Sequence, residues 1–383
     1  MDITTFDAAA ERLAGKITRF NRRVLVSLGG DIQDVTSRTA NTLQNAVWHA
    51  DALQIELASL MQKSVKDATD IISLAGLEAN KQALAYFKLY GLELLPNRKA
   101  LLAQNLLLSV SEITSGRFTN LSNTRAIGYR ALGPGGRTVF YGFRDAYVKI
   151  IDDAITEMAT GVRGFRPIYR DTLMQFADGG LRVVDFGSGR TIALDSHLRQ
   201  SVLDGVRDIW QANHDRVGRE FGADGVELSA HGGCAPDHLP YQGKQYSHRQ
   251  FEKLQDSLER PIGMWNCRHI AFPVIMGVSQ PAYSNRQLKE LRDMSERKVE
   301  FDGEEYTAYQ GTQLQRRIET AIRRHKDRAV LAKAAEDDLT RRIEQAKINA
   351  LTAKYAKLSK AFELPYYTER MSVAGFRPVR VKR

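Results

Sequence analysis

Apolar residues recur every three or four positions along the first 115 residues, which is the spacing of a single helix face. A run from Phe6 to Val24 predicts a first helix that ends at Gly29-Gly30. Asp31 is then placed to cap a second helix, whose apolar stripe extends from Val35 to Leu60. A stripe of that length indicates a helix packed lengthwise against another, in the same chain or in a second copy. With further helical patterns up to Ile113, this region predicts a helical bundle or stalk.

Turn-forming residues follow and place a domain boundary near residue 125. Beyond it, helical patterns alternate with short strands. Residues 181–186 and 191–194 predict one hairpin, and the turn Asp302-Gly303 predicts another. Residues 270–278 are extended, but a proline inside them restricts them to an edge strand. Three Ser/Thr-x-x-Gln sequences predict helix starts, at Ser247, Ser284 and Thr307.

After Thr307 the helical pattern returns and predicts two helices, up to about Ala335 and from about Asp337 to Ala361. These form a predicted αα-hairpin with basic outer faces. The predicted fold is α+β and predominantly helical. Its three parts are an N-terminal helical region (1–125), a central α+β module with a small sheet (126–306), and a basic helical arm with a tail (307–383).

The composition indicates a globular chain and excludes several classes of protein. Its 43% hydrophobic and 26% charged residues are ordinary for a globular chain. No apolar run approaches the roughly 18 residues that a membrane-spanning helix needs, and the first 20 residues lack the pattern of a secretory signal. Two cysteines in 383 residues do not make a disulfide framework, which fits a reducing cytosol.

The net charge of +10 lies entirely in the last part of the chain. Residues 312–383 hold 18 Lys/Arg and 8 Asp/Glu, which leaves 37 of each for residues 1–311. A local basic segment predicts a polyanionic partner, either double-stranded DNA or an acidic protein surface, although a solvated basic helix face is the simpler alternative. We expect solvated side chains that contact DNA phosphates without reading sequence, at Arg316, Arg317, Arg323, Arg324, Lys326 and Arg328.

Six of the ten His and Cys residues fall within 39 positions, at His231, Cys234, His238, His248, Cys267 and His269. Two short clusters of such ligands, about 30 residues apart, can form a tetrahedral zinc site that clips loops together. The candidate ligands are His231, His238, Cys267 and His269, with Trp265 packed behind them. Three alternatives stay open: histidines that hydrogen-bond the loop, cysteines buried as small hydrophobic residues, or a disulfide.

The same segments resemble the phage minor capsid protein 2 family and, more distantly, the Mu F-type minor head proteins. The resemblance extends over about residues 165–375. Its motifs are Ser229-Ala230-His231, His238, Gln242-Gly243, Asn266-Cys267-Arg268-His269, Pro273 and Gly277-Val278-Ser279. Cys234 departs from the family pattern, so it ranks below the other candidate ligands.

The resemblance implies a structural, non-enzymatic protein of a tailed phage. It implies a place inside the head near the portal, after assembly in the host cytoplasm. The partners implied are the portal or the major capsid protein and packaged DNA, and a second copy of the chain is a further candidate. The alternatives are a His/Cys metal-dependent nuclease, with His248 as a base, and a DNA-binding adaptor from outside phages. The deaminase pattern and the lysine of a phosphate-binding loop are both absent.

Overall fold

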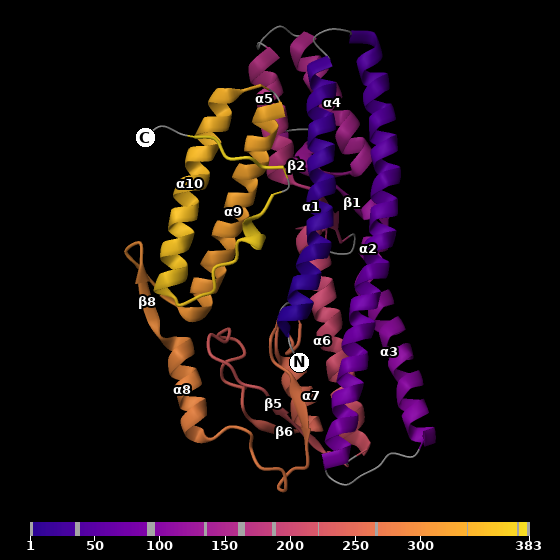
Figure 1. The fold of residues 1–383 in the computed structure, drawn as a ribbon, viewed down its shortest axis with the longest axis vertical. Helices are drawn as coiled ribbons and strands as arrows, with labels where there is room; N and C mark the ends of the chain where they lie inside the picture. The colour runs from indigo at the N-terminus through magenta and orange to yellow at the C-terminus, as the bar shows by residue number, and fades with distance from the viewer. Residues whose placement is uncertain are drawn as a thin grey trace.

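Three long helices form one side of an elongated molecule (Figure 1). The computed structural model describes residues 3–34, 39–89, 96–133, 136–159, 165–185, 189–220, 222–264, 267–334, 336–373 and 375–380. The three helices are α1 (Ile3–Asp34), α2 (Thr39–Leu89) and α3 (Pro96–Ser122). The predominantly helical α+β class predicted from the sequence is confirmed.

A four-stranded antiparallel sheet follows these helices, in the order β2-β1-β3-β4. The predicted hairpin of β3 and β4 is confirmed, whereas the hairpin of β1 and β2 was missed because its strands flank a glycine-rich turn that was interpreted only as a boundary. The elements are η1 (Thr124–Ala126), β1 (Ile127–Leu132), β2 (Thr138–Gly142), α4 (Phe143–Ala159), α5 (Phe165–Gly179), β3 (Arg182–Val184) and β4 (Thr191–Ala193).

Helix α6 (Leu194–Glu220) leads into a second antiparallel sheet, in the order β6-β5-β7. Strand β7 lies at its edge, as its proline predicts. The capping boxes predicted at Ser247 and Ser284 are both confirmed. The elements are β5 (Gly225–Leu228), β6 (Gln245–Ser247), α7 (His248–Ser257), β7 (Ala271–Val274) and α8 (Asn285–Glu296).

A hairpin of two strands then leads into a hairpin of two helices. Asp302 and Gly303 both have positive φ, 54° and 82°, which the predicted two-residue turn requires. The Thr307 side chain accepts a hydrogen bond from the backbone N–H of Gln310, and Asp337 caps the last helix in the same way. The elements are β8 (Lys298–Phe301), β9 (Glu304–Thr307), α9 (Ala308–Ala334), α10 (Asp338–Ala361) and η3 (Glu369–Met371).

The expectation that the first 115 residues stand apart is wrong. Apolar side chains of α1, α2, α3, α4, α6 and the first sheet form one continuous buried core. The described part of the predicted stripe, which lies on α2, is part of this core, so it gives no reason to expect a second copy. Val35, where the stripe was predicted to begin, lies outside the described residues. Helix α6 packs against α2 closely enough that a Cβ on Gly205 would lie 2.4 Å from Ile72 Cδ1. The boundaries near residues 125 and 306 stay predictions.

Two local predictions near the end of α1 are also wrong. Gly29-Gly30 does not end the helix, because tertiary packing outweighs the low helix propensity of two glycines. Asp31 is not a cap but a buried side chain of the same helix. Its carboxylate accepts a hydrogen bond of 2.7 Å from the Tyr147 hydroxyl on α4, and His49 Nδ1 on α2 lies 2.7 Å from its other oxygen.

This contact gives a test of how α1, α2 and α4 are joined. We predict that Tyr147→Phe lowers the free energy of unfolding by about 1–3 kcal/mol, because the buried Asp31 carboxylate loses a donor. The change is measured by urea denaturation of the full chain. The control is Tyr366→Phe on an exposed ring, for which we expect a change below about 0.5 kcal/mol. Equal effects of the two substitutions would contradict the assigned contact.

Candidate metal centre

The His/Cys cluster is brought together by the pairing of β5 with β7. Leu228 pairs with Ala271, and the Ser229 backbone N–H bonds the Ile270 carbonyl just beyond. The loop that follows β5 therefore lies beside the segment that precedes β7. The loop supplies three of the residues and the segment supplies two. Trp265, which was predicted to pack behind the cluster, lies outside the described residues.

One group centres on the buried thiol of Cys267. Its Sγ lies 3.3 Å from His238 Nδ1 and 3.3 Å from His269 Nδ1. All three side chains are buried, and their potential ligand atoms lie within 4.8 Å of one another. Three of the four predicted ligands are thus in contact.

The far ring nitrogens of these two histidines both meet oxygen acceptors. His238 Nε2 lies 2.7 Å from the Arg260 carbonyl, so this nitrogen carries the proton and donates it. His269 Nε2 lies 3.2 Å from Gln242 Oε1. The same Oε1 accepts a hydrogen bond from the His231 backbone N–H, which fixes the orientation of the amide. Both Nδ1 atoms therefore face the sulfur of Cys267.

His231 belongs to a second group, with Cys234 and His269. The His231 and His269 rings lie 4.6 Å apart between centroids, and Cys234 Sγ lies 3.6 Å from His269 Nε2. The Cys234 thiol also lies 3.3 Å from the Ala235 carbonyl, to which it donates. Among the residues described, His231 Nε2 is buried with no hydrogen-bond partner. The four predicted ligands thus divide between two groups that share His269.

The two thiols have opposite acidities. Burial alone would raise the pKa of Cys267, but hydrogen bonds with His238 and His269 lower it to about 5. Burial raises the pKa of Cys234 to about 12, and the neighbouring Cys267 adds to this rise. Burial lowers the pKa of His231, whereas for His238 the contacts with Cys267 and Arg260 outweigh burial and raise its pKa. Cys267 is therefore the thiolate of the cluster near neutral pH.

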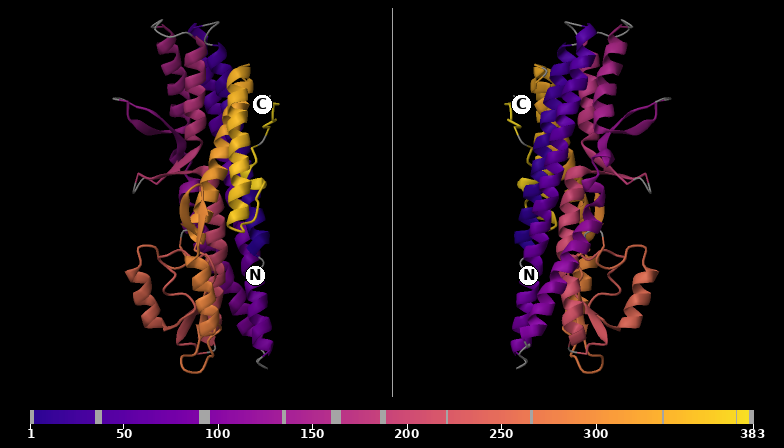
Figure 2. Two further views of the ribbon diagram at one scale, coloured as in Figure 1. Left: turned by 90° about the vertical axis from the view of Figure 1, so that its left-hand side faces the viewer. Right: turned by 90° about the vertical axis from the view of Figure 1, so that its right-hand side faces the viewer.

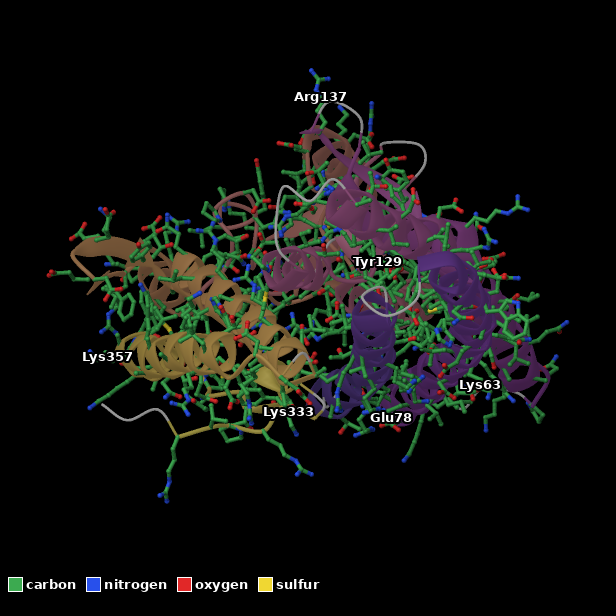
Figure 3. The ribbon with its side chains drawn as sticks, turned by 90° about the horizontal axis from the view of Figure 1, so that it is seen from above. Lys63, Glu78, Tyr129, Arg137, Lys333 and Lys357 are labelled. Carbon is green, nitrogen blue, oxygen red and sulfur yellow. The ribbon has the colours of Figure 1, made fainter. Side chains whose placement is uncertain are left out.

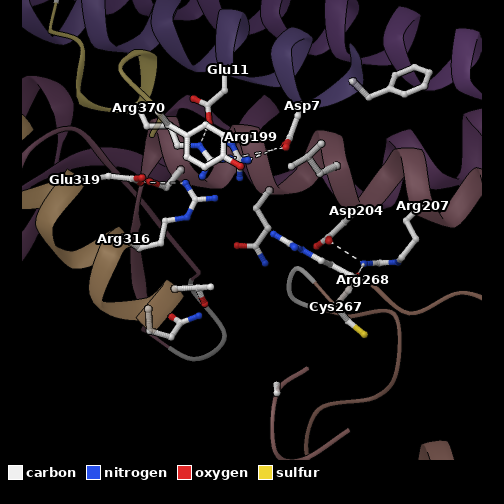
Figure 4. A pocket seen from close by; sticks show the side chains of 18 of the residues that line it. Asp7, Glu11, Arg199, Asp204, Arg207, Cys267, Arg268, Arg316, Glu319 and Arg370 are labelled. Atoms are coloured by element: carbon white, nitrogen blue, oxygen red, sulfur yellow. Dashed lines mark hydrogen bonds and ion pairs between the residues drawn. The ribbon is translucent and has the colours of Figure 1, made fainter. Parts of the chain in front are cut away.

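The cluster lines a cleft of about 670 Å³ between α1, α6, α9 and the loops (Figure 4). At one end of the cleft Arg199 bonds Asp7 and Glu11 at 2.8 and 2.5 Å, with Arg316 and Arg370 beside them. At the other end lie Cys267, Arg207 and Arg268, and Arg207 pairs with Asp204 and Asp208 at 3.1 and 3.0 Å. The cleft is thus lined by many charged side chains of both signs.

The expectation that the α9 cations are solvated is wrong for most of them. Arg323 pairs with Asp195 at 2.7 Å, and Arg328 pairs with Asp178. Lys326 donates to the Met371 carbonyl at 2.8 Å, and Arg316 pairs with Glu319 at 3.2 Å. Arg323, Lys326 and Arg328 thus hold α9 against the rest of the chain, whereas the Arg316–Glu319 pair lies within α9. The two exposed members of the set are Arg317 and Arg324.

Helix α10 instead carries most of the exposed basic surface: the sequence predicted basic outer faces for both helices of this hairpin, but the predicted DNA contacts were all placed on α9. Between Thr340 and Ala361 there are six Lys/Arg and a single acidic residue, Glu344, which is buried. That imbalance was visible in the sequence, but the predicted DNA contacts were placed on α9 because its Lys/Arg residues are more densely spaced. Figure 3 shows Lys357 pointing outward from this side of the molecule. The exposed cations of the α10 face are Arg342, Lys347, Lys357 and Lys360.

Residues 43–358, about four fifths of the chain, match the family model described as phage minor capsid protein 2. The chain belongs to the phage minor capsid protein 2 family. No curated protein and no solved structure matches it. This minor capsid protein therefore has a structural role in a phage capsid and associates with the virion. None of the described helices of this family member is both long enough and apolar enough to cross a membrane.

One partly buried acid near the C-terminal end of α9, Asp327, gives a pH test. Burial raises the pKa of Asp327 to about 7, Arg323 opposes this shift and Asp195 adds to it. Because the folded-state pKa lies above the ordinary value of 3.8, folding favours the protonated acid. Its contribution to stability is complete in acid and is lost as the pH rises through about 7.

We therefore predict that Asp327→Asn, which cannot ionise, gains stability over the original protein by roughly 1–3 kcal/mol between about pH 5 and pH 8. The measurement is urea denaturation of this minor capsid protein at both pH values. Asp256→Asn, at an exposed position, is the control and should follow the original protein. A variant whose stability runs parallel to the original over this range would rule out the assigned pKa.

Proposed function

We propose that this minor capsid protein lies inside the phage head near the portal, where its α10 face contacts packaged double-stranded DNA without reading its sequence. The portal or the major capsid protein would hold the body of the molecule. The family supports the capsid role itself. The proposed contact with DNA rests on the positive charge of the exposed α10 face.

The observation that carries this proposal is a row of exposed cations with no exposed acid among them. Within the described part of the chain, Arg342, Lys357 and Lys360 have no ion pair. Glu344, the one acidic residue of this stretch, is buried, and it accepts a hydrogen bond of 2.9 Å from Lys347. Such a face attracts phosphates through charge and counterion release, which does not depend on base sequence.

We predict weak binding to a linear DNA duplex that falls steeply as salt rises, measured by fluorescence anisotropy. The variant with Arg342, Lys347, Lys357 and Lys360 all changed to Gln should bind more weakly and should fold normally, because these side chains are exposed. The slope of log affinity against log salt should fall by about 0.9 for each DNA phosphate that the variant no longer neutralises.

A matched control removes the same four charges elsewhere, from Lys63, Lys66, Lys81 and Lys99, which are exposed on α2 and α3. Lys63 and Lys357 lie on opposite sides of the molecule in Figure 3. The control should keep nearly all of its DNA affinity. Equal decreases in the two variants would show a response to net charge alone, and no binding by the intact protein would leave docking on an acidic capsid or portal surface as the alternative.

The location has its own test. In phage heads that contain this protein, we expect the chain to resist an added protease while the shell is closed. After the shell is opened and the DNA released, the same protease should cleave it. The readout is the intact band on an immunoblot, with a tail protein as the accessible control. Cleavage in closed, DNA-filled heads would contradict an interior location.

A further inference from the structure

We propose that His238, Cys267 and His269 bind one zinc ion, through the Nδ1 atoms of the two histidines and the Sγ atom of the cysteine. This set differs from the four ligands predicted from the sequence, because His231 lies in the neighbouring group. The inference rests on the geometry of the cluster. It holds whether or not the α10 face contacts DNA.

The spacing of the three atoms fits the edges of a zinc tetrahedron. With Zn–S near 2.3 Å and Zn–N near 2.0 Å, a nitrogen and a sulfur on one ion lie roughly 3.5 Å apart. Both Sγ–Nδ1 distances here are 3.3 Å. Along these two edges an ion therefore requires shifts of only a few tenths of an ångström. Thiolate and imidazole are also the ligand types that zinc prefers.

Both histidines are already oriented as ligands. A metal-binding histidine usually donates its other N–H to an oxygen, which fixes the ring and directs the free lone pair. The Arg260 carbonyl has this role for His238, at 2.7 Å, and Gln242 Oε1 has it for His269, at 3.2 Å. Gln242 is itself buried and is held by the His231 backbone N–H. Gln242 is thus a positioning residue and not a ligand.

The neighbouring group of His231, Cys234 and His269 is a weaker candidate. Its use would require His269 Nε2, which already donates to Gln242. It would also require a Cys234 thiolate, whereas that thiol donates to its own neighbour's carbonyl at 3.3 Å. Only one ion can use the His269 lone pair, and the contacts direct it toward Cys267.

The ion would add a link between two chain segments that the β5–β7 pairing and a few side-chain hydrogen bonds already bring together. His238 lies in the loop after β5, and Cys267 and His269 lie in the segment before β7. The Cys267 carbonyl also accepts a hydrogen bond from Arg207 of α6, at 3.4 Å. All three ligands line the cleft, so a water molecule from the cleft would complete the coordination.

One rival explains the same contacts without a metal. A Cys267 thiolate could accept hydrogen bonds from protonated histidines at these distances. The two arrangements differ in what they predict: the ion pair needs no metal for folding, whereas the zinc site couples metal binding to stability. They also differ in spectrum, because only a metal thiolate gives a ligand-to-metal charge-transfer band.

The test uses the untagged full chain, reduced and freed of metal with a chelator, then loaded with zinc or cobalt(II) and passed through a desalting column. We expect about one zinc ion per chain by elemental analysis and a higher melting temperature in the loaded protein. Cobalt should give a thiolate charge-transfer band and the strong visible absorption of four-coordinate geometry. A loaded protein that retains neither metal and melts as the metal-free protein does would overturn the proposal.

Two cysteine variants locate the ion. Cys267→Ser should abolish the cobalt charge-transfer band, whereas Cys234→Ser, the matched control in the same cluster, should keep it. Gln242→Ala should leave the band in place and weaken zinc binding by about 10- to 100-fold. If Cys267→Ser does not fold, the other two variants still decide: disappearance of the band in Cys234→Ser would assign the ion to the neighbouring group and refute the proposed ligand set.

Discussion

The burial of α6 along its whole length is the constraint on which the rest of the structure depends. Its apolar side, which includes Leu198, Val202, Ile209 and Trp210, lies in the main core with α1, α2 and α3. Its polar side holds the loops of the cluster, since Gln211 bonds both the backbone N–H and the carbonyl of Ala271, at 3.1 and 2.9 Å. The N-terminal helices and the His/Cys loops therefore pack on different sides of the same helix, α6 (Figure 2).

Much of the local structure followed from the sequence because the signals were local. The capping sequences, the Asp302-Gly303 turn and the two C-terminal helices each depend on residues within a few positions of one another. The N-terminal region was predicted less well. Gly29-Gly30 lies inside a helix because the core formed with distant elements outweighs its propensity, and no short window of sequence contains that information.

In the candidate site, too, the local features could be predicted from the sequence and the long-range contacts could not. The sequence indicated which residue types gather, since the histidines and cysteines are close along the chain. It could not show that His269 faces Cys267 with one ring nitrogen and Gln242 with the other. The α9 cations were misjudged for a related reason. Arg323 and Arg328 form ion pairs with acidic residues 128 and 150 positions away in the sequence. Part of the dense basic run therefore stabilises the fold through internal ion pairs.

The separation between paired inner cations and open outer cations has a mechanical consequence. A polyanion that touches α10 need not break the Arg323–Asp195 and Arg328–Asp178 pairs that fix α9 to the body, because none of these four residues lies on α10. Contact would therefore cost little rearrangement, and release would be correspondingly quick. With the proposed DNA contact, such a surface would let a duplex slide past during packaging, so the protein would line the path of the DNA without holding it in place.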